Sequence, residues 1–351
     1  MKLLVYKDSL SVGRGADKAV KAFAEALSGR GHDVRLVERG AFAAALEESW
    51  DAIVATGSNE AMDLDAAGYF ERAGRSPVVL QLHLAPRGFF KWRHPLRNLA
   101  IRRAFRKVDA VQLLCSEYAA EFARMAPGVP AKVIGNYTEM KGGEERDRAS
   151  AESVILYPAA AVNKVKNQKL LIEAFARVAV EFPGWSVRLL GKAESGYAHS
   201  CRALAKRLGV ADRVDFVGFT DDLAGEYSRA EFIAFPSVLE GFPLAILEAA
   251  AFSLPAVVHS LLPGAGDIVK NGETGLVASP DPEEYAKALA LMMTDGDMRR
   301  RLGASARERC ASEYSKDRVL REWEDLLQSL QPSNPLTLQP SKPPNFQTST
   351  S

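Results

Sequence analysis

Short apolar runs that alternate with helical segments constrain the fold of this chain more than any other feature of its sequence. Runs of this kind, bounded by polar turn residues, are typical of strands buried on both faces of a parallel sheet. The intervening helices would cover the two faces, so we predict an α/β fold. The expected strands span residues 2–6, 34–37, 52–56, 78–82, 110–114, 132–134, 154–157, 187–190, 214–217 and 256–258.

The length of 351 residues suggests two domains, each large enough to bury a core of its own. The net charge of +1 gives no general attraction to nucleic acid. Cys115, Cys201 and Cys310 lie far apart without the spacing of a metal site, so we expect reduced thiols. No run approaches the roughly 20 apolar residues of a membrane-spanning helix. We therefore expect a cytoplasmic protein that could still lie on the inner face of the membrane.

The stretch from residue 232 to 255, FIAFPSVLEGFPLAILEAAAFSLP, predicts a strand, a loop and a helix in that order. The apolar run ends at Pro236 and the loop contains Glu240. Pro243 suits the first helical position, because its missing N–H would have no partner there. The helix should end near Ser253, since Pro255 cannot continue it.

The start of this helix has the properties of an anion-binding site. The backbone N–H groups of residues 242–244 would be free at the helix start and would attract a phosphate. Glu240 lies at the mouth of the helix and Glu248 one to two turns inside it, and both carboxylates could accept hydrogen bonds from hydroxyls. Phosphates and hydroxyls together suggest a nucleotide sugar. The alternative is that Glu240 is a helix-end charge and that Glu248 lies on a solvated face.

Several motifs in the second half of the chain follow one another in a characteristic order. They are Lys166-Asn167, Ile172-Glu173-Ala174-Phe175, Gly218-Phe219, Pro236-Ser237, Glu240-Gly241-Phe242, Glu248-Ala249, Pro255-Ala256-Val257-Val258 and Gly272-Glu273-Thr274-Gly275-Leu276-Val277. The order resembles that of the GT-B glycosyltransferases of family 4, the glycosyl transferases group 1. This resemblance implies an α/β, GT-B fold with two Rossmann-like domains that face a central cleft and a C-terminal helix that crosses back to the first domain.

The resemblance also implies the domain organisation. We expect an acceptor domain over residues 1–145, a nucleotide-sugar donor domain over 146–314 and a crossover helix over 315–330. The charged stretch 139–153 would be the hinge. Residues 331–351 are rich in Pro, Ser, Thr, Gln and Asn and are expected to be a disordered tail.

From the same resemblance we expect Lys166 and Glu240 to act on the donor diphosphate and sugar, and Glu248 to hold the ribose hydroxyls. The stretch beside Gly218 would receive the nucleotide base. A glycine loop near the N-terminus would close over the diphosphate, although such loops also merely join a strand to a helix. The other expected donor contacts are Gly13, Gly15, Gly241, Phe242, Pro243 and Leu244.

His83 directly follows the expected strand at residues 78–82, where ligands gather in open α/β sheets. A lone histidine in this position is often structural. The resemblance instead places a histidine after this strand near the transferred sugar, so we expect His83 to be a catalytic residue.

One position departs from the family pattern. Five residues before Lys166 the family has an arginine, and this chain has Ala161. The departure leaves open whether a paired Arg/Lys clamp holds the diphosphate. Asn163, Lys164 or a basic residue of the first domain could take the place of the arginine.

The segment from Arg87 to Lys107 is rich in Arg and Lys, contains no acidic residue and interleaves these bases with aromatic and aliphatic side chains. Such a combination is typical of a helix that lies on an anionic membrane surface. An acceptor diphosphate site would use the same chemistry. A solvated helix face is a further alternative, and nucleic acid is disfavoured because the bases are confined to this one segment.

The resemblance implies a retaining, metal-independent transfer of a hexose-type sugar to an envelope polysaccharide or lipid-linked acceptor, with no further cofactor. No Asp-x-Asp pair stands in a suitable loop, because 63–65 falls in the first domain and 295–297 is expected to cap a helix. A sugar-nucleotide epimerase or phosphorylase and a non-catalytic nucleotide-sugar-binding protein are the alternatives. An epimerase would be expected to carry extra histidines, and a phosphorylase a far longer chain.

Overall fold

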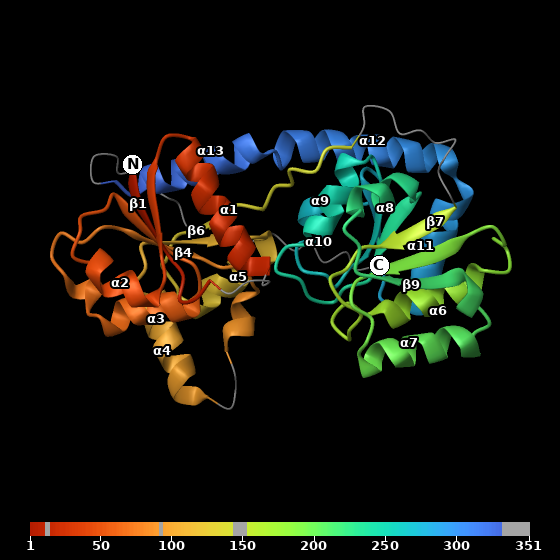
Figure 1. Cartoon of the computed structure of the whole chain (residues 1–351), viewed down its shortest axis with the longest axis horizontal. Coiled ribbons are helices and arrows are strands. Elements are labelled where there is room, and N and C mark those ends of the chain that lie inside the picture. The colour runs from red at the N-terminus through yellow and green to blue at the C-terminus, as the bar shows by residue number, and fades with distance from the viewer. Residues whose placement is uncertain (11–14, 91–93, 143–152, 332–351) are drawn as a thin grey trace, which may run out of the picture. The chain divides into compact units, whose positions relative to one another are not determined.

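The computed structural model describes residues 1–10, 15–90, 94–142 and 153–331 of the chain. It divides into two compact units (Figure 1). Unit 1 consists of Met1–Gly135 together with the chain from Val319 onwards, and unit 2 consists of Asn136–Arg318. The first division therefore falls between Gly135 and Asn136, before the stretch in which we expected the hinge.

The core of unit 1 is a six-stranded parallel sheet with the order β2-β1-β3-β4-β5-β6. β1 lies between β2 and β3, with Leu4 opposite Arg35 and Ile53. The central strands are fully buried because both faces of the sheet are covered by helices. The strands are β1 (Lys2–Tyr6), β2 (Asp33–Val37), β3 (Ala52–Ala55), β4 (Val78–Gln81), β5 (Ala110–Leu113) and β6 (Ala131–Val133).

The helices of unit 1 alternate with these strands, as the sequence pattern predicts. They are α1 (Gly15–Gly29), α2 (Arg39–Ala45), α3 (Ser58–Ala66), α4 (Pro95–Phe105) and α5 (Ser116–Met125).

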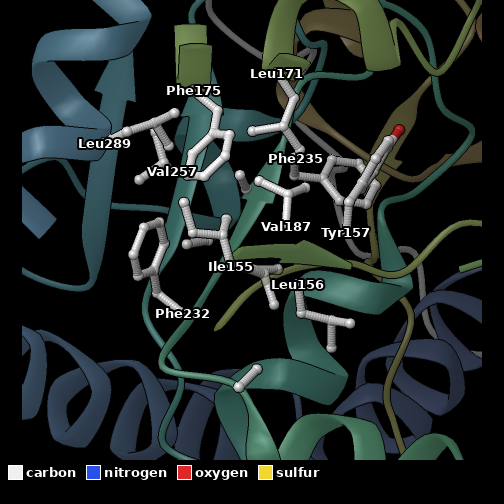
Figure 2. Packing of buried hydrophobic residues seen from close by; sticks show 14 of the residues in the cluster. Ile155, Leu156, Tyr157, Leu171, Phe175, Val187, Phe232, Phe235, Val257 and Leu289 are labelled. Carbon is white, nitrogen blue, oxygen red and sulfur yellow. The ribbon is translucent and has the colours of Figure 1, made fainter. Parts of the chain in front are cut away.

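Unit 2 repeats this architecture with a parallel sheet in the order β12-β11-β10-β7-β8-β9. Figure 2 shows its core, in which Ile155, Val187, Phe232 and Val257 from four neighbouring strands lie in one buried cluster with Phe175. The last strand was not expected as a strand from the sequence. The strands are β7 (Val154–Tyr157), β8 (Ser186–Leu190), β9 (Val214–Gly218), β10 (Phe232–Phe235), β11 (Ala256–His259) and β12 (Gly275–Ala278).

The helix expected after Pro243 is shorter than predicted. It begins at Leu244 with Pro243 as its N-cap and ends at Ala251, because Ser253 adopts a left-handed conformation with φ 57°. The helices of unit 2 are α6 (Gln168–Val178), α7 (Gly196–Arg207), α8 (Leu223–Arg229), α9 (Leu244–Ala251), α10 (Ala265–Ile268), α11 (Pro282–Thr294) and α12 (Gly296–Glu313).

The C-terminal helix α13 (Lys316–Ser329) returns the chain to unit 1, as expected. The ring of Trp323 lies 4.6 Å from that of Phe23 on α1, and Glu324 accepts hydrogen bonds from Arg30 Nε at 2.8 Å and Nη2 at 2.9 Å. The prediction of a disordered tail concerns residues that, except for residue 331, lie outside the described part of the chain.

The structure also bears on the state of the cysteines and on membrane-spanning segments. Cys115, Cys201 and Cys310 are all buried free thiols, as expected. Within the described residues, no helix has the length and apolar character needed to cross a bilayer.

Candidate functional site

The order of the strands in unit 2 marks a place for a ligand. From β7 the chain proceeds to β8 and β9 on one side of the sheet, and it then crosses to β10, β11 and β12 on the other. The loops that follow β7 and β10 therefore leave the carboxyl edge in opposite directions. In open α/β sheets the crevice between two such loops is where ligands bind.

Lys166 and Glu240, two of the predicted site residues, meet at this crevice. Lys166 Nζ lies 2.5 Å from Glu240 Oε1 and 2.7 Å from Oε2. Only 20% of the lysine side chain and 12% of the glutamate side chain are exposed, so the ion pair is largely shielded from water. Glu240 stands three residues before the N-cap of α9, which places the ammonium group close to the start of that helix.

Backbone and tyrosine hydrogen bonds hold the two loops together. The buried hydroxyl of Tyr157 donates to the carbonyl of Lys166 at 2.8 Å and lies 2.7 Å from the hydroxyl of Ser237. Val238 N donates to Val165 O at 2.9 Å. Burial raises the pKa of Tyr157 well above its usual value, so the tyrosine stays protonated and keeps this donor. These hydrogen bonds fix the two loops that carry Lys166 and Glu240 relative to each other.

A cavity of about 240 Å³ opens beside the carboxyl ends of β7, β8 and β9. Its described lining is mostly apolar, and Glu248 on α9 supplies the one carboxylate found there. A concave apolar site with a single convergent acid suits a flat aromatic ring next to a group that carries hydroxyls. The lining residues are Pro158, Ala159, Ala160, Leu190, Gly191, Phe219, Thr220, Leu223, Ala245 and Glu248.

The Glu248 carboxylate is held in place by a buried tyrosine. The Tyr227 hydroxyl donates to Glu248 Oε2 at 2.9 Å, and the Tyr227 ring is stacked on Phe252. Among the described residues, none forms a hydrogen bond with Glu248 Oε1. Burial raises the pKa of Glu248, although the hydrogen bond from Tyr227 acts in the opposite direction.

Two glycines shape the wall of this cavity through their backbone. Gly191 has φ 103°, and a Cβ there would lie 2.2 Å from the carbonyl oxygen of Ala159. Its N–H donates to Gly218 O at 2.7 Å, and Gly218 itself has φ 85°. No other residue would fit at position 191 without moving the β7 loop. Gly218 does not line the cavity, but the next residues, Phe219 and Thr220, do.

The expected set of free backbone donors at the start of α9 is partly wrong. Pro243 has no N–H, and Leu244 N donates to Phe242 O at 2.8 Å. Within the described residues, the N–H groups of Gly241 and Phe242 have no hydrogen-bond partner. The phosphate-binding potential therefore lies just before the helix, and Phe242 is fixed there by the ring of Tyr314, 6.1 Å away.

Ala161, which stands where the resemblance implies an arginine, pairs with Lys192 in an isolated parallel bridge. Lys192 N donates to Ala160 O at 3.1 Å, and Val162 N donates to Lys192 O at 2.8 Å. Paired residues of a parallel bridge direct their side chains to the same side. Lys192 is exposed and directly follows Gly191 of the cavity wall, so its side chain lies on the same side as that of Ala161.

In unit 1, His83 lies two residues beyond β4 with its Nε2 buried and without a partner in the described structure. Burial lowers the pKa of His83 to about 4, the charge of Lys7 acts in the same direction and that of Asp17 opposes it. The imidazole is therefore neutral near pH 7. Of the two glycines expected to close over the donor, Gly13 lies outside the described residues and Gly15 begins α1.

This neutral histidine should make the stability of the protein depend on pH. The unfolded chain takes up a proton at His83 near pH 6.5, whereas the folded chain does so only near pH 4. The free energy of unfolding should therefore fall as the pH is lowered from about 6.5 to about 4. We expect the variant His83→Gln to lose this part of the slope in urea denaturation across that range. An unchanged slope would show that His83 is solvated in the folded protein.

Sequence reasoning missed a charged cluster at the corresponding edge of unit 1. Lys7 Nζ lies 2.6 Å from Glu60 Oε1 and 2.9 Å from Asp8 Oδ1, and Asn59 Nδ2 donates to Asp8 Oδ2 at 2.8 Å. Glu60 is almost fully buried, which raises its pKa. The chain passes from β1 to β2 on one side and to β3 on the other, so this cluster also occupies a point where the strand order reverses.

The Asp-x-Asp pairs are occupied by partners of the protein itself. Asp63 accepts a hydrogen bond from Tyr6 Oη at 2.5 Å and pairs with Arg39. Asp65 pairs with Lys107 at 2.5 Å. Asp295 is the N-cap of α12 and accepts a hydrogen bond from Met298 N at 2.8 Å, which confirms the expected cap.

Comparisons with known proteins agree with this architecture. Residues 144–309 match the model of the family "Glycosyl transferases group 1". An exopolysaccharide phosphotransferase, SCO2592, of Streptomyces coelicolor is 34% identical over 45% of this chain and 17% of its own length. A Campylobacter jejuni transferase, named as an alpha-1,4-N-acetyl-D-galactosaminyltransferase acting on a GalNAc-containing diphospho-undecaprenol, is 30% identical over 35% of this chain and 33% of its own length.

The fold is shared with solved structures over nearly the whole chain. Anabaena Alr3699/HepE in complex with UDP superposes with a TM-score of 0.78 over 94% of this chain and 100% of that chain, at 20% identity. The two-domain GT-B fold expected from the motifs is thereby confirmed. The chain spans about half the length, or less, of the first curated relatives that it matches.

Proposed function

We propose that this chain, which has the GT-B fold and whose residues 144–309 match the glycosyl transferases group 1, is a retaining, metal-independent glycosyltransferase of the family 4 type. It would move a hexose-type sugar from a nucleotide-diphosphate sugar to an envelope polysaccharide or lipid-linked acceptor. The observation that carries this proposal is the cavity in unit 2, where Glu248 is the only carboxylate among the described lining residues.

The nucleoside end of the donor fits this cavity. A base can lie against the backbone at Gly191 and the side chain of Phe219, where apolar surface predominates. The ribose hydroxyls can then donate to Glu248, whose Oε2 is fixed by Tyr227 and whose Oε1 has no described partner. Such charge-assisted hydrogen bonds contribute about 1.5–3 kcal/mol each.

The diphosphate is the part of the donor on which Lys166 acts. As the bond to the sugar breaks, negative charge grows on the leaving phosphate, and a nearby ammonium group stabilises that charge. The carboxylate of Glu240 orients Lys166 in the free protein and can accept hydrogen bonds from the sugar hydroxyls once the donor is bound. The free N–H groups of Gly241 and Phe242 provide further donors to phosphate.

The acceptor is assigned to unit 1, and its hydroxyl would attack the same face of the sugar that the phosphate leaves. The leaving phosphate oxygen accepts the proton of that hydroxyl, so no side-chain nucleophile is required. His83, neutral and next to the edge of the sheet, can position the acceptor or the transferred sugar by a hydrogen bond. The curated names of relatives that refer to exopolysaccharide and to diphospho-undecaprenol support an envelope acceptor.

The proposal is tested by a screen of nucleotide sugars. The thermal unfolding midpoint of the purified chain should rise with the correct donor, because a donor at about 100 times its Kd adds about 2.7 kcal/mol to stability. Slow release of the sugar to water should follow, and it should persist in the presence of EDTA. If no donor raises the midpoint, the cavity is not a nucleotide site and the proposal fails.

Binding of a donor without any turnover would instead support the alternative, a non-catalytic nucleotide-sugar-binding protein. Ala161 is the feature that favours this alternative, because the family arginine is missing there. Adding membrane lipid extract as a source of acceptor distinguishes an inactive protein from one that transfers the sugar only when its acceptor is present.

We propose that Lys192 replaces the missing arginine at the diphosphate. The variant Lys192→Ala should lower the rate of sugar release about 10-fold or more, since a hydrogen bond from a charged group contributes about 1.5–3 kcal/mol. The matched control is Lys164→Ala, which removes an exposed lysine from the β7 loop. A larger effect of Lys164→Ala than of Lys192→Ala would assign the compensating cation to the β7 loop instead.

A further inference from the structure

The outward face of α4 carries exposed leucines that the fold of unit 1 does not use. Leu96 is 83% exposed and Leu99 is 65% exposed, one helical turn apart, while Ile101 and Phe105 on the opposite face are fully buried. Figure 1 shows α4 projecting away from the sheet of its unit. Leu96 and Leu99 therefore form a small exposed apolar patch on this projecting face.

The same face carries two positive charges that no described carboxylate neutralises, although the guanidinium group of Arg102 lies 5.1 Å from the centroid of the Phe90 ring. Arg102 and Arg106 follow Leu99 at spacings of three and seven residues, so all three lie on one side of the helix. Neither arginine has a carboxylate partner in the described part of the chain, whereas the neighbouring Arg103 and Lys107 are both paired with Asp65.

Arg97 ties α4 to α3 and to the turn Pro86–Phe89 of unit 1. Arg97 Nη1 donates to Phe89 O at 3.1 Å, and Nη2 donates to Asn59 Oδ1 at 2.9 Å. Asn59 in turn donates to Asp8 of the charged cluster at the strand ends. A surface that binds the outward face of α4 is therefore held at a set distance from that cluster.

We propose that the face formed by Leu96, Leu99, Arg102 and Arg106 docks onto the surface of an anionic lipid bilayer. The leucines would enter the boundary between headgroups and acyl chains, and the guanidinium groups would contact lipid phosphates. Docking would hold the charged cluster of unit 1 near the membrane. Only the further step, that the acceptor reaches this cluster from the lipid phase, rests on the proposed function.

The charges on this face favour lipid over a second copy of the chain. In a two-fold symmetric pair the same patch lies on both sides, so four arginines would enter one interface to which residues 87–107 contribute no carboxylate. An acidic protein would neutralise the arginines but would leave the exposed leucines unexplained unless it were also apolar. An anionic bilayer supplies both the phosphate charge for the arginines and the apolar interior for the leucines, so it matches this face better than either protein partner.

The test measures binding of the full chain to vesicles without donor or acceptor, so its outcome is independent of the proposed function. We expect binding to phosphatidylcholine vesicles that contain phosphatidylglycerol, weakening as salt is raised, and little binding to phosphatidylcholine alone. Arg102→Ser with Arg106→Ser should weaken binding about 25-fold, at about 5-fold for each base. Leu96→Ser with Leu99→Ser should weaken it about 10-fold or more.

The control is Val180→Ser with Arg207→Ser, which removes an exposed apolar side chain and an exposed base from unit 2. It should bind vesicles as the parent chain does, and unchanged circular dichroism and thermal unfolding would show that every variant is folded. Three results would overturn the proposal. The first is that the parent chain does not bind anionic vesicles, and the second is that the control variant loses as much vesicle binding as the test variants. The third is that the parent chain is a dimer and the leucine variant a monomer, which would make the face a contact between two copies of the chain.

Discussion

Replacing Lys166 with alanine is expected to lower the kcat of sugar transfer about 10²- to 10³-fold, the effect typical of losing one group that stabilises transition-state charge. The ammonium group acts on the phosphate oxygen that becomes negative as the sugar departs, and it adds less to the ground state, whose charge is already spread over two phosphates. The loss should therefore appear in kcat and kcat/KM together, with a small change in the KM for the donor.

The nearby Lys169 provides a matched control for this experiment. Its ammonium group lies 5.2 Å from the centroid of the Tyr197 ring on α7, and it forms no described ion pair with the predicted site residues. Lys169→Ala should leave kcat within a few-fold of the parent value. If Lys166→Ala raises KM and spares kcat, the lysine serves only to bind the donor, and the proposed transition-state role is wrong.

The Lys166–Glu240 contact illustrates what the sequence could predict. The sequence predicts Glu240 at the mouth of a helix, and the motif order implies that Lys166 and Glu240 act on one donor. Sequence spacing alone does not bring together two residues that lie 74 positions apart. Their contact depends on β7 and β10 being neighbours, which the strand order of the sheet shows.

Elements with weak local patterns were missed for identifiable reasons. β12 has only four residues and begins with Gly275, so the sequence shows no continuous β-branched run there. Glycine is required at this position because a Cβ would lie 2.4 Å from the carbonyl oxygen of Ala256. The charged cluster of unit 1 was missed because Lys7 and Asp8 resemble ordinary turn residues after a strand. Only the placement of β3 beside β1 brings Asn59 and Glu60 to them.

Glu248→Ala is expected to weaken the binding of the donor by a factor on the order of 10² to 10⁴, because two charge-assisted hydrogen bonds to the ribose are lost. Alanine also leaves the buried Tyr227 hydroxyl without its 2.9 Å partner. Glu248→Gln is therefore the matched variant, since its amide oxygen still accepts from Tyr227, while the negative charge is removed and the second acceptor oxygen is replaced by an NH2 donor. Its loss of affinity, measured by calorimetry with the donor, should lie between those of the parent and the alanine variant.

The pH dependence of these variants separates a ligand-binding role from a structural one. Burial raises the pKa of Glu248, so the carboxylate in the free protein is protonated at a higher pH than an ordinary glutamate. A donor that binds the ionised form should lose affinity as the pH falls through this raised pKa, and the glutamine variant should show no such loss. The effect of Glu248 on the stability of the free protein runs in the opposite direction. Its contribution is complete below the pKa of Glu248 in the unfolded chain and is lost as the pH rises through the raised pKa of the folded chain. If affinity for the donor is instead independent of pH in the parent, or falls in parallel in the glutamine variant, Glu248 does not bind the ribose.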